Sequence, residues 1–251
     1  MTYSNTTARV DHGYIVGVDL GKIADFTAIA VLRLSEYVEV VDERDEQRAV
    51  EACIAGLPVP GSAAHEWANA GQMPLRGRPK ARVMAYELVH LDRVPLGTSY
   101  PAVVDHVGSL LWRPPLRGRA QLVVDATGVG VPIVDLLRQA GMQPHPITIT
   151  SGGRPTRDPH GGGYHVPKRD LVDLLAVLLQ TERLAIASAL RFAQALADEL
   201  LSFEARQTAA GNDTYGAREG AHDDLVLATA IAAWYGLRHV PDGAWQPGPR
   251  T

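Results

Sequence analysis

The sequence contains one cysteine, Cys53, so neither an intramolecular disulfide nor a metal site built from several thiolates is possible. No apolar run is long enough to span a bilayer, and the first residues lack the basic start and apolar stretch of a secretory signal. These absences predict a cytosolic protein. Positive charge is not in excess either. The formal net charge of −4 counts against general nucleic-acid binding, although local basic patches can still hold phosphates.

The 251 residues suffice for one good-sized domain, and 46% of them are hydrophobic, as in ordinary soluble proteins. Three stretches have the composition of irregular structure: a charged and then Gly-, Pro- and Ala-rich segment, a glycine-rich basic loop at 151–163, and the C-terminal tail. We therefore expect an N-terminal extension at 1–13, a domain at 14–236 with an insertion at about 42–82, and a flexible tail at 237–251.

Between these stretches, the apolar pattern predicts an α/β fold with a mixed sheet flanked by helices. Three β-branched runs follow one another without long helices, which predicts that the first three strands are antiparallel. Later strands alternate with helices and are expected to be parallel. Strands are expected at 14–20, 27–34, 83–91, 121–126 and 145–150, with a short apolar segment at 183–187. Helices are expected at 100–112, 131–140, 167–181, 189–203 and 222–236.

Acidic residues occupy three places where an unpaired carboxylate is expensive to desolvate. Asp19 interrupts the first apolar strand and Asp125 ends the strand at 121–126. Asp223 and Asp224 begin the apolar last helix. Each also has a purely structural interpretation, because a carboxylate can end a strand, cap a turn or cap a helix.

Several converging carboxylates are tolerated when they bind a divalent cation, and oxygen-only ligands suit Mg²⁺ or Mn²⁺. Two such ions about 3.5–4 Å apart would activate water and stabilise the leaving oxygen in phosphodiester hydrolysis. The order of the three acidic positions along the chain is a stronger signal than any one of them.

Five segments of the chain, between about residues 14 and 236, resemble the nuclease domain of phage DNA-packaging terminase large subunits. They are GVDLGKIADFTAIAVL, VVDATGVGVPIVDLL, YHVPKRDLVDLLAVLLQTERLAI, LADELLSF and GAHDDLVLATAIA. The resemblance implies a ribonuclease-H-like fold and an endonuclease that cuts double-stranded DNA with two Mg²⁺ or Mn²⁺ ions. It places the ligands at Asp19, Asp125 and one of the pair Asp223 and Asp224.

We favour Asp224 as the main ligand, with Asp223 as a cap or secondary ligand, and Asp25 and His222 as accessory groups. The resemblance also implies an ATPase motor, a small terminase subunit and a portal as partners, in the cytoplasm of a bacterial host and with no membrane. The chain has no G-x-x-x-x-G-K-[ST] loop, so ATP-driven translocation is not predicted for it.

Basic residues that follow the acidic positions are candidates for phosphate contacts. Lys168 and Arg169 open a predicted helix, where backbone N–H groups favour an anion, and Arg154 and Arg157 lie in the loop just before them. Such contacts give affinity without sequence readout. Further basic clusters lie at 76–82 and 113–119. The alternative for each cluster is a solvated surface.

Three other functions fit part of the pattern. GVDLG before a hairpin also resembles the first phosphate motif of actin-like ATPases, although that fold normally needs a longer chain. A Holliday-junction resolvase or transposase core would share the acidic positions and cut other DNA structures. A degenerate ribonuclease-H-like docking module would bind no metal, and the intact acidic positions argue against it.

Overall fold

The fold is built around one mixed sheet, seen in a computed structural model that describes residues 5–21, 25–41, 79–128, 130–159, 162–207, 213–217 and 222–239. The chain divides into two units, one comprising residues 1–11 and 35–84 and the other residues 12–34 and 85–251. All candidate site residues belong to the second unit.

The sheet has eight strands in the order β6-β7-β5-β4-β1-β2-β3-β8. The first three strands are antiparallel, and β4, β5 and β7 extend the sheet in parallel from β1. β8 pairs in parallel with β3, and β6 pairs antiparallel with β7. A separate antiparallel hairpin consists of β9 and β10. The strands are β1 (Asn5–Asp19), β2 (Thr27–Val41), β3 (Pro79–Val94), β4 (Ala120–Asp125), β5 (Pro144–Thr150), β6 (Thr156–Arg157), β7 (Tyr164–Pro167), β8 (Leu184–Ile186), β9 (Phe203–Gln207) and β10 (Asp213–Ala217).

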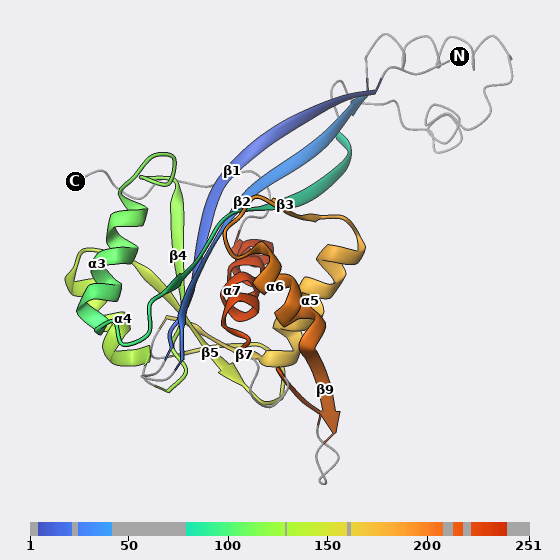
Figure 1. Cartoon of the computed structure of the whole chain (residues 1–251). Coiled ribbons are helices and arrows are strands. Elements are labelled where there is room, and N and C mark those ends of the chain that lie inside the picture. Colours follow the sequence, from blue (N-terminus) through green and yellow to red (C-terminus); the bar gives the residue numbers. More distant parts are fainter. Residues whose placement is uncertain are drawn as a thin grey trace, which may run out of the picture. The chain divides into compact units, whose positions relative to one another are not determined.

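Helices cover both faces of the sheet in the second unit (Figure 1). They are α3 (Tyr100–Leu111), α4 (Gly130–Gln139), α5 (Lys168–Gln180), α6 (Ala193–Ser202) and α7 (Asp224–His239). Helices α3 and α4 lie on one face, and α5, α6 and α7 lie on the other (Figure 1). Helix α7 contacts β4, while α5 and α6 pack against α7, which explains why α7 is buried nearly all round. Within the described residues, no helix combines the length and apolar character needed to cross a bilayer.

Alternation along β1 decides which side chains face which helices, because successive residues of a strand point to opposite faces. Tyr14, Val16 and Val18 join the cluster that packs under α3 and α4. The intervening positions, Ile15 and Gly17, therefore face α7. The next residue on that side is Asp19.

Gly17 allows α7 to approach the sheet closely. A β-carbon at this position would lie 2.1 Å from the carbonyl oxygen of Ala228 and 2.9 Å from the Cβ of Ala232. Because a glycine backbone presents no side chain, the helix packs directly on the strand. This contact sets the distance between α7 and β1, and it therefore also sets the position of the acidic residues at the start of α7.

The predicted order of elements agrees with the structure, but several short strands were not predicted. The segment at 151–163 was expected to be a loop, yet it contains β6, and β7 follows it directly. The β9–β10 hairpin was also missed, since its strands carry few apolar residues and pair only with each other. β1 begins at Asn5, within the expected N-terminal extension, and β3 begins at Pro79, within the expected insertion. Helix α6 begins at Ala193, later than expected. Residues 42–78 of the expected insertion and residues 240–251 of the expected tail lie outside the described residues.

Candidate metal centre

Neighbouring strands place Asp19 and Asp125 side by side. β1 and β4 are parallel, with Gly17 opposite Val123 and Val18 opposite Val124. The next pair along this register is Asp19 and Asp125, and both side chains point to the face that carries α7. The two carboxyl groups interact directly, and each perturbs the ionisation of the other. The sequence placed Asp19 within the first expected strand and Asp125 at the end of the strand at 121–126, and the register brings the two aspartates together.

Burial makes both carboxyl groups of this pair harder to ionise, and their proximity adds to the effect on Asp19. Burial, followed by the charge of Asp125, raises the pKa of Asp19 well above its ordinary value, and the Asp223 and Asp224 carboxylates add to the rise. Burial also raises the pKa of Asp125. A divalent cation between such groups would reverse the repulsion, since it favours the charged form of each.

Thr127 fixes the orientation of Asp125. Its backbone N–H donates to Asp125 Oδ1 at 2.8 Å, and its hydroxyl donates to the same oxygen at 2.5 Å. The hydroxyl oxygen in turn accepts the N–H of Ile149 at 2.8 Å, which ties the turn to β5. The capping interpretation of Asp125 is therefore true in part, because one oxygen binds the following turn while the carboxyl group also contacts Asp19.

Asp223 and Asp224 begin α7 and each has a basic partner. The carbonyl of Asp223 accepts the N–H of Leu227 at 2.9 Å, so this residue stands at the helix N-cap. Its side chain accepts a hydrogen bond from Lys168 Nζ at 2.5 Å. Asp224 is buried, and both its oxygens bind Arg93: Nε donates to Oδ2 at 2.8 Å and Nη2 donates to Oδ1 at 3.0 Å.

Glu199 is a buried acidic residue that sequence reasoning missed. It lies on α6, and its Oε2 accepts the N–H of Val226 at 3.0 Å. This is the bond that an N-cap side chain would normally make, so a residue of another helix caps α7. Burial raises the pKa of Glu199 to about 7, with the Asp224 carboxylate adding to the rise. The only available signal was a glutamate within the apolar segment LADELL.

Arg93 is the second missed residue. It lies near the end of β3, with 15% of its side chain exposed. Besides Asp224 it contacts Glu199 through Nη2, and its guanidinium lies 5.0 Å from the centre of the Phe26 ring. A single arginine after an apolar strand gave no indication that it would meet the start of a helix more than a hundred residues later.

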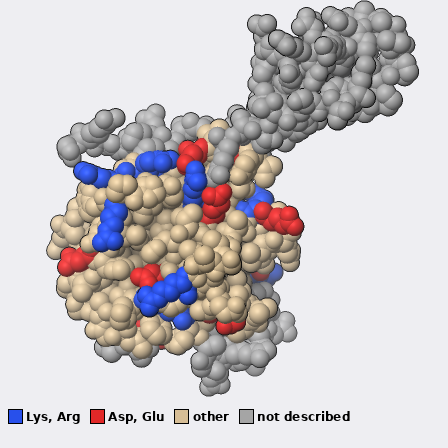
Figure 2. All heavy atoms as spheres, turned by 45° about the horizontal axis from the view of Figure 1, so that its top comes forward, with Lys and Arg blue, Asp and Glu red and all other residues tan. Residues whose placement is uncertain are grey.

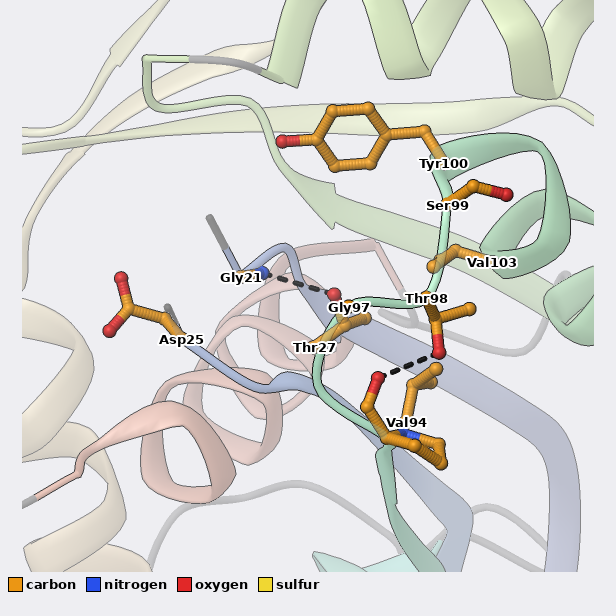
Figure 3. A pocket seen from close by; sticks show the side chains of 10 residues that line it. Gly21, Asp25, Thr27, Val94, Gly97, Thr98, Ser99, Tyr100 and Val103 are labelled. Carbon is orange, nitrogen blue, oxygen red and sulfur yellow. Dashed lines mark hydrogen bonds between the residues drawn. The ribbon is translucent and has the colours of Figure 1, made fainter. Parts of the chain in front are cut away.

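The two predicted accessory residues are more peripheral. Asp25 is exposed and lines a cavity of about 220 Å³ together with Gly21 and Thr27. The other wall of this cavity comes from the segment between β3 and α3, which carries Thr98, and from Tyr100 at the start of α3 (Figure 3). His222 is exposed, and its ring meets that of Phe26 edge to face, with centroids 5.3 Å apart.

The four basic residues proposed to contact DNA are not equivalent. Lys168 lies at the acidic cluster, bound to Asp223, rather than on an open surface. Arg169 is exposed and forms an ion pair with Asp173 at 3.2 Å. Arg154 and Arg157 are exposed in and beside β6. Of the four, Lys168 alone is thus tied directly to the candidate site.

The charge balance at the site fits a divalent cation. Five carboxylates gather there, and two basic side chains, Arg93 and Lys168, oppose them, which leaves an excess of three carboxylates. The five are Asp19, Asp125, Glu199, Asp223 and Asp224. The donor set is all oxygen, as Mg²⁺ and Mn²⁺ prefer. Even so, no three acidic, histidine or cysteine side chains in the described part of the chain are arranged to hold one ion. The side chains of Asp223 and Asp224 are turned to their basic partners instead.

Comparison with known proteins identifies the fold. No protein-family model matches the chain. The terminase large subunits of Thermus phage G20c and Thermus virus P23-45 are each 29% identical to it over 115 residues, which is 46% of this chain. The match covers 20% of each relative, so it spans about a fifth of the length of these curated relatives.

Solved structures match over most of the chain. The large terminase nuclease from thermophilic phage G20c has a TM-score of 0.51 at 19% identity, covering 93% of this chain and 90% of that one. The large terminase nuclease domain of Thermus phage P74-26 has a TM-score of 0.52 at 20% identity, covering 92% and 83%. The chain therefore resembles terminase large subunits in sequence and has the ribonuclease-H-like fold of their nuclease domains.

Proposed function

We propose that this chain is a metal-dependent endonuclease that cuts double-stranded DNA during viral genome packaging. One observation carries the proposal: in a fold shared with terminase nucleases, Asp19, Asp125 and Asp224 come from three separate elements and lie near enough on one face of the sheet for each of the other two to raise the pKa of Asp19. Structural capping explains a single aspartate, but it does not explain why several carboxylates raise one another's cost of ionisation.

Asp19, Asp125 and Asp224 are proposed as the main ligands of two divalent cations, Mg²⁺ or Mn²⁺, with Asp223 as a secondary ligand. When bound, such ions supply activation of the attacking water and stabilisation of the leaving oxygen. Thr127 holds Asp125 in place, and the N-terminus of α7 adds the positive end of a helix dipole beside the site. Asp25 and His222 are proposed as accessory groups at the edge of the site.

Related structures support the choice of metal. The large terminase nuclease from phage G20c has been solved with bound magnesium, and that structure covers 92% of this chain at a TM-score of 0.52. The same nuclease has also been solved with bound cobalt. Because the curated relatives are much longer, an ATPase motor, a small terminase subunit and a portal are proposed as partners, in the cytoplasm of a bacterial host. The proposed nuclease domain is residues 14–236.

DNA is proposed to be held through its phosphates by Arg154, Arg157, Lys168 and Arg169. Among the described residues on the face seen in Figure 2, basic and acidic side chains are interspersed and form no continuous basic strip. Together with the net charge of −4, this pattern predicts weak and strongly salt-dependent binding to DNA by the isolated chain. Other packaging components would then supply much of the affinity.

Plasmid cleavage tests this function. Supercoiled plasmid is incubated with the purified chain in Mg²⁺, Mn²⁺ or EDTA, beside Asp19→Asn, Asp125→Asn and Asp224→Asn. We expect cleavage in either metal, none in EDTA, and a fall of on the order of a hundredfold or more in each variant, since loss of even an outer partner of a metal ligand typically costs 10- to 100-fold.

Two further variants sharpen the test. Asp105→Asn removes an exposed aspartate of α3 and should cleave like the wild type. Asp223→Asn should be milder than Asp224→Asn, and the reverse order would exchange the two roles. Wild-type cleavage by folded Asp19→Asn or Asp125→Asn protein would refute the assignment at that position. A folded wild-type chain that neither cleaves DNA nor binds Mn²⁺ would instead indicate a docking module.

A further inference from the structure

Arg93 binds the carboxylate of Asp224, which is proposed as a main metal ligand. Its Nε and Nη2 bind the two different oxygens of Asp224 at 2.8 Å and 3.0 Å, in the forked geometry that suits a guanidinium and a carboxylate. Both groups are largely withdrawn from solvent, with 15% of the Arg93 side chain and 7% of the Asp224 side chain exposed. A buried pair of this kind is not easily screened by salt.

Glu199 gives the same arginine a second partner. Nη2 of Arg93 contacts Glu199 Oε1, while Glu199 Oε2 accepts the N–H of Val226. The bond to the α7 backbone holds Glu199 in place independently of Asp224. If the guanidinium left Asp224, it would keep one carboxylate partner and would not become an unpaired buried charge, which is the costly outcome.

The arrangement of the other carboxylates agrees with a competition for Asp224. Asp19 and Asp125 contact each other, whereas both oxygens of Asp224 are bound to Arg93. In the described ranges, no three potential ligands surround a common point. A divalent cation that recruited Asp224 would therefore have to draw the carboxylate away from at least one arginine donor.

We propose that Arg93 competes with a divalent cation for Asp224, and that Glu199 retains the arginine when the cation binds. This inference rests on the proposed metal-dependent function. Arg93 and Glu199 are positioning residues in it: they act through Asp224 and set how readily the site takes up metal. The exchange moves one guanidinium between two carboxylates that it already touches, and it needs no change in the fold.

Mn²⁺ titration of the whole chain by calorimetry, without DNA and at pH 8, tests the exchange. Arg93→Lys preserves the charge, but an ammonium cannot bind both oxygens of Asp224 in a fork and Glu199 as well. We expect its Mn²⁺ affinity to rise about tenfold, which corresponds to about 1.4 kcal/mol. Glu199→Gln should lower the affinity by a similar factor, because the arginine loses its alternative anionic partner.

Arg93→Lys also separates direct competition from simple charge repulsion. If only the net charge mattered, this variant would bind Mn²⁺ like the wild type, and that result would overturn the proposal. A fall in affinity would overturn it too, because it would mean that Arg93 orients Asp224 for the metal. The rise should persist at 0.5 M NaCl, where effects that act through solvent are screened.

The controls address folding and the proposed function itself. Arg138→Lys alters another Arg–Asp pair, that with Asp135 on α4, and should leave Mn²⁺ affinity unchanged. Melting curves in EDTA identify variants that fail to fold, and Arg93→Gln, whose affinity should also rise, replaces any that do. If the folded wild type binds no Mn²⁺, the proposed function fails and the inference fails with it. If the wild type binds and Arg93→Lys is unchanged, only the inference fails.

Discussion

Gly17→Ala is the substitution with the sharpest structural consequence. Its new methyl group would lie 2.1 Å from the carbonyl oxygen of Ala228 and 2.9 Å from the Cβ of Ala232. Neither atom can move without the helix, because the oxygen belongs to the backbone of α7 and the Cβ is bonded directly to that backbone. Helix α7 would therefore have to move away from β1 by more than an ångström to restore an ordinary contact.

The expected cost follows from overpacking. Forcing extra atoms into a packed core costs about 1–3 kcal/mol, and the gain of about 0.5–1 kcal/mol for replacing glycine within a strand offsets only part of it. With a cost near the upper end, the net loss is about 2 kcal/mol, which lowers the melting temperature of a domain of this size by about 4–8 °C. Mn²⁺ affinity should fall as well, because α7 carries Asp223 and Asp224 at its start.

Gly152→Ala is the matched control, because a β-carbon there would have no neighbour within 4 Å and the backbone conformation is an ordinary one. Thermal melting in EDTA and Mn²⁺ titration of both variants provide the comparison. If Gly17→Ala melts at or above the wild-type temperature, while Gly152→Ala behaves as expected, then α7 does not rest on Gly17 as described and the placement of its acidic residues must be reconsidered.

Two further predictions concern pH, and both are measured by urea unfolding in EDTA between pH 4 and 8.5. Burial raises the pKa of Glu199 from 4.5 to about 7, so its contribution is fully present below pH 4.5 and is lost as the pH rises through 7. Glu199→Gln should remove this loss, about 3 kcal/mol in free energy of unfolding, and an unchanged pH profile would contradict the assignment. His145 lies at the other end of α7, stacked on Tyr235 at 4.7 Å, and burial lowers its pKa from 6.5 to about 4. Its contribution is fully present above pH 6.5 and is lost as the pH falls through 4, so His145→Asn should lose less stability than the wild type between pH 6.5 and 4. The difference should stay below about 3 kcal/mol because the ring is only half-buried.

The resemblance to terminase nucleases could be recognised from the sequence because the acidic residues stand in or beside apolar segments that are easily identified. Asp19 interrupts one apolar strand and Asp125 ends another, and Asp223 and Asp224 stand at the start of a helix that is apolar on every side. Periodicity and composition are local properties, so the mixed sheet and the order of the larger elements could also be predicted. Short polar strands carry no such pattern, and β6 and the β9–β10 hairpin were accordingly missed.

The sequence by itself determined which residues are acidic at the strand ends, and the alternation that turns Asp19 to the same face as Gly17. Only the tertiary structure decided how those carboxylates are partnered. Arg93 and Asp224 are 131 residues apart in the chain, and Arg93 and Glu199 are 106 apart. Their meeting depends on β3 ending beside the start of α7 and on α6 packing against α7. Which charged side chains form an ion pair depends on which of them the fold brings close together, and a local sequence pattern carries no information about such distant neighbours.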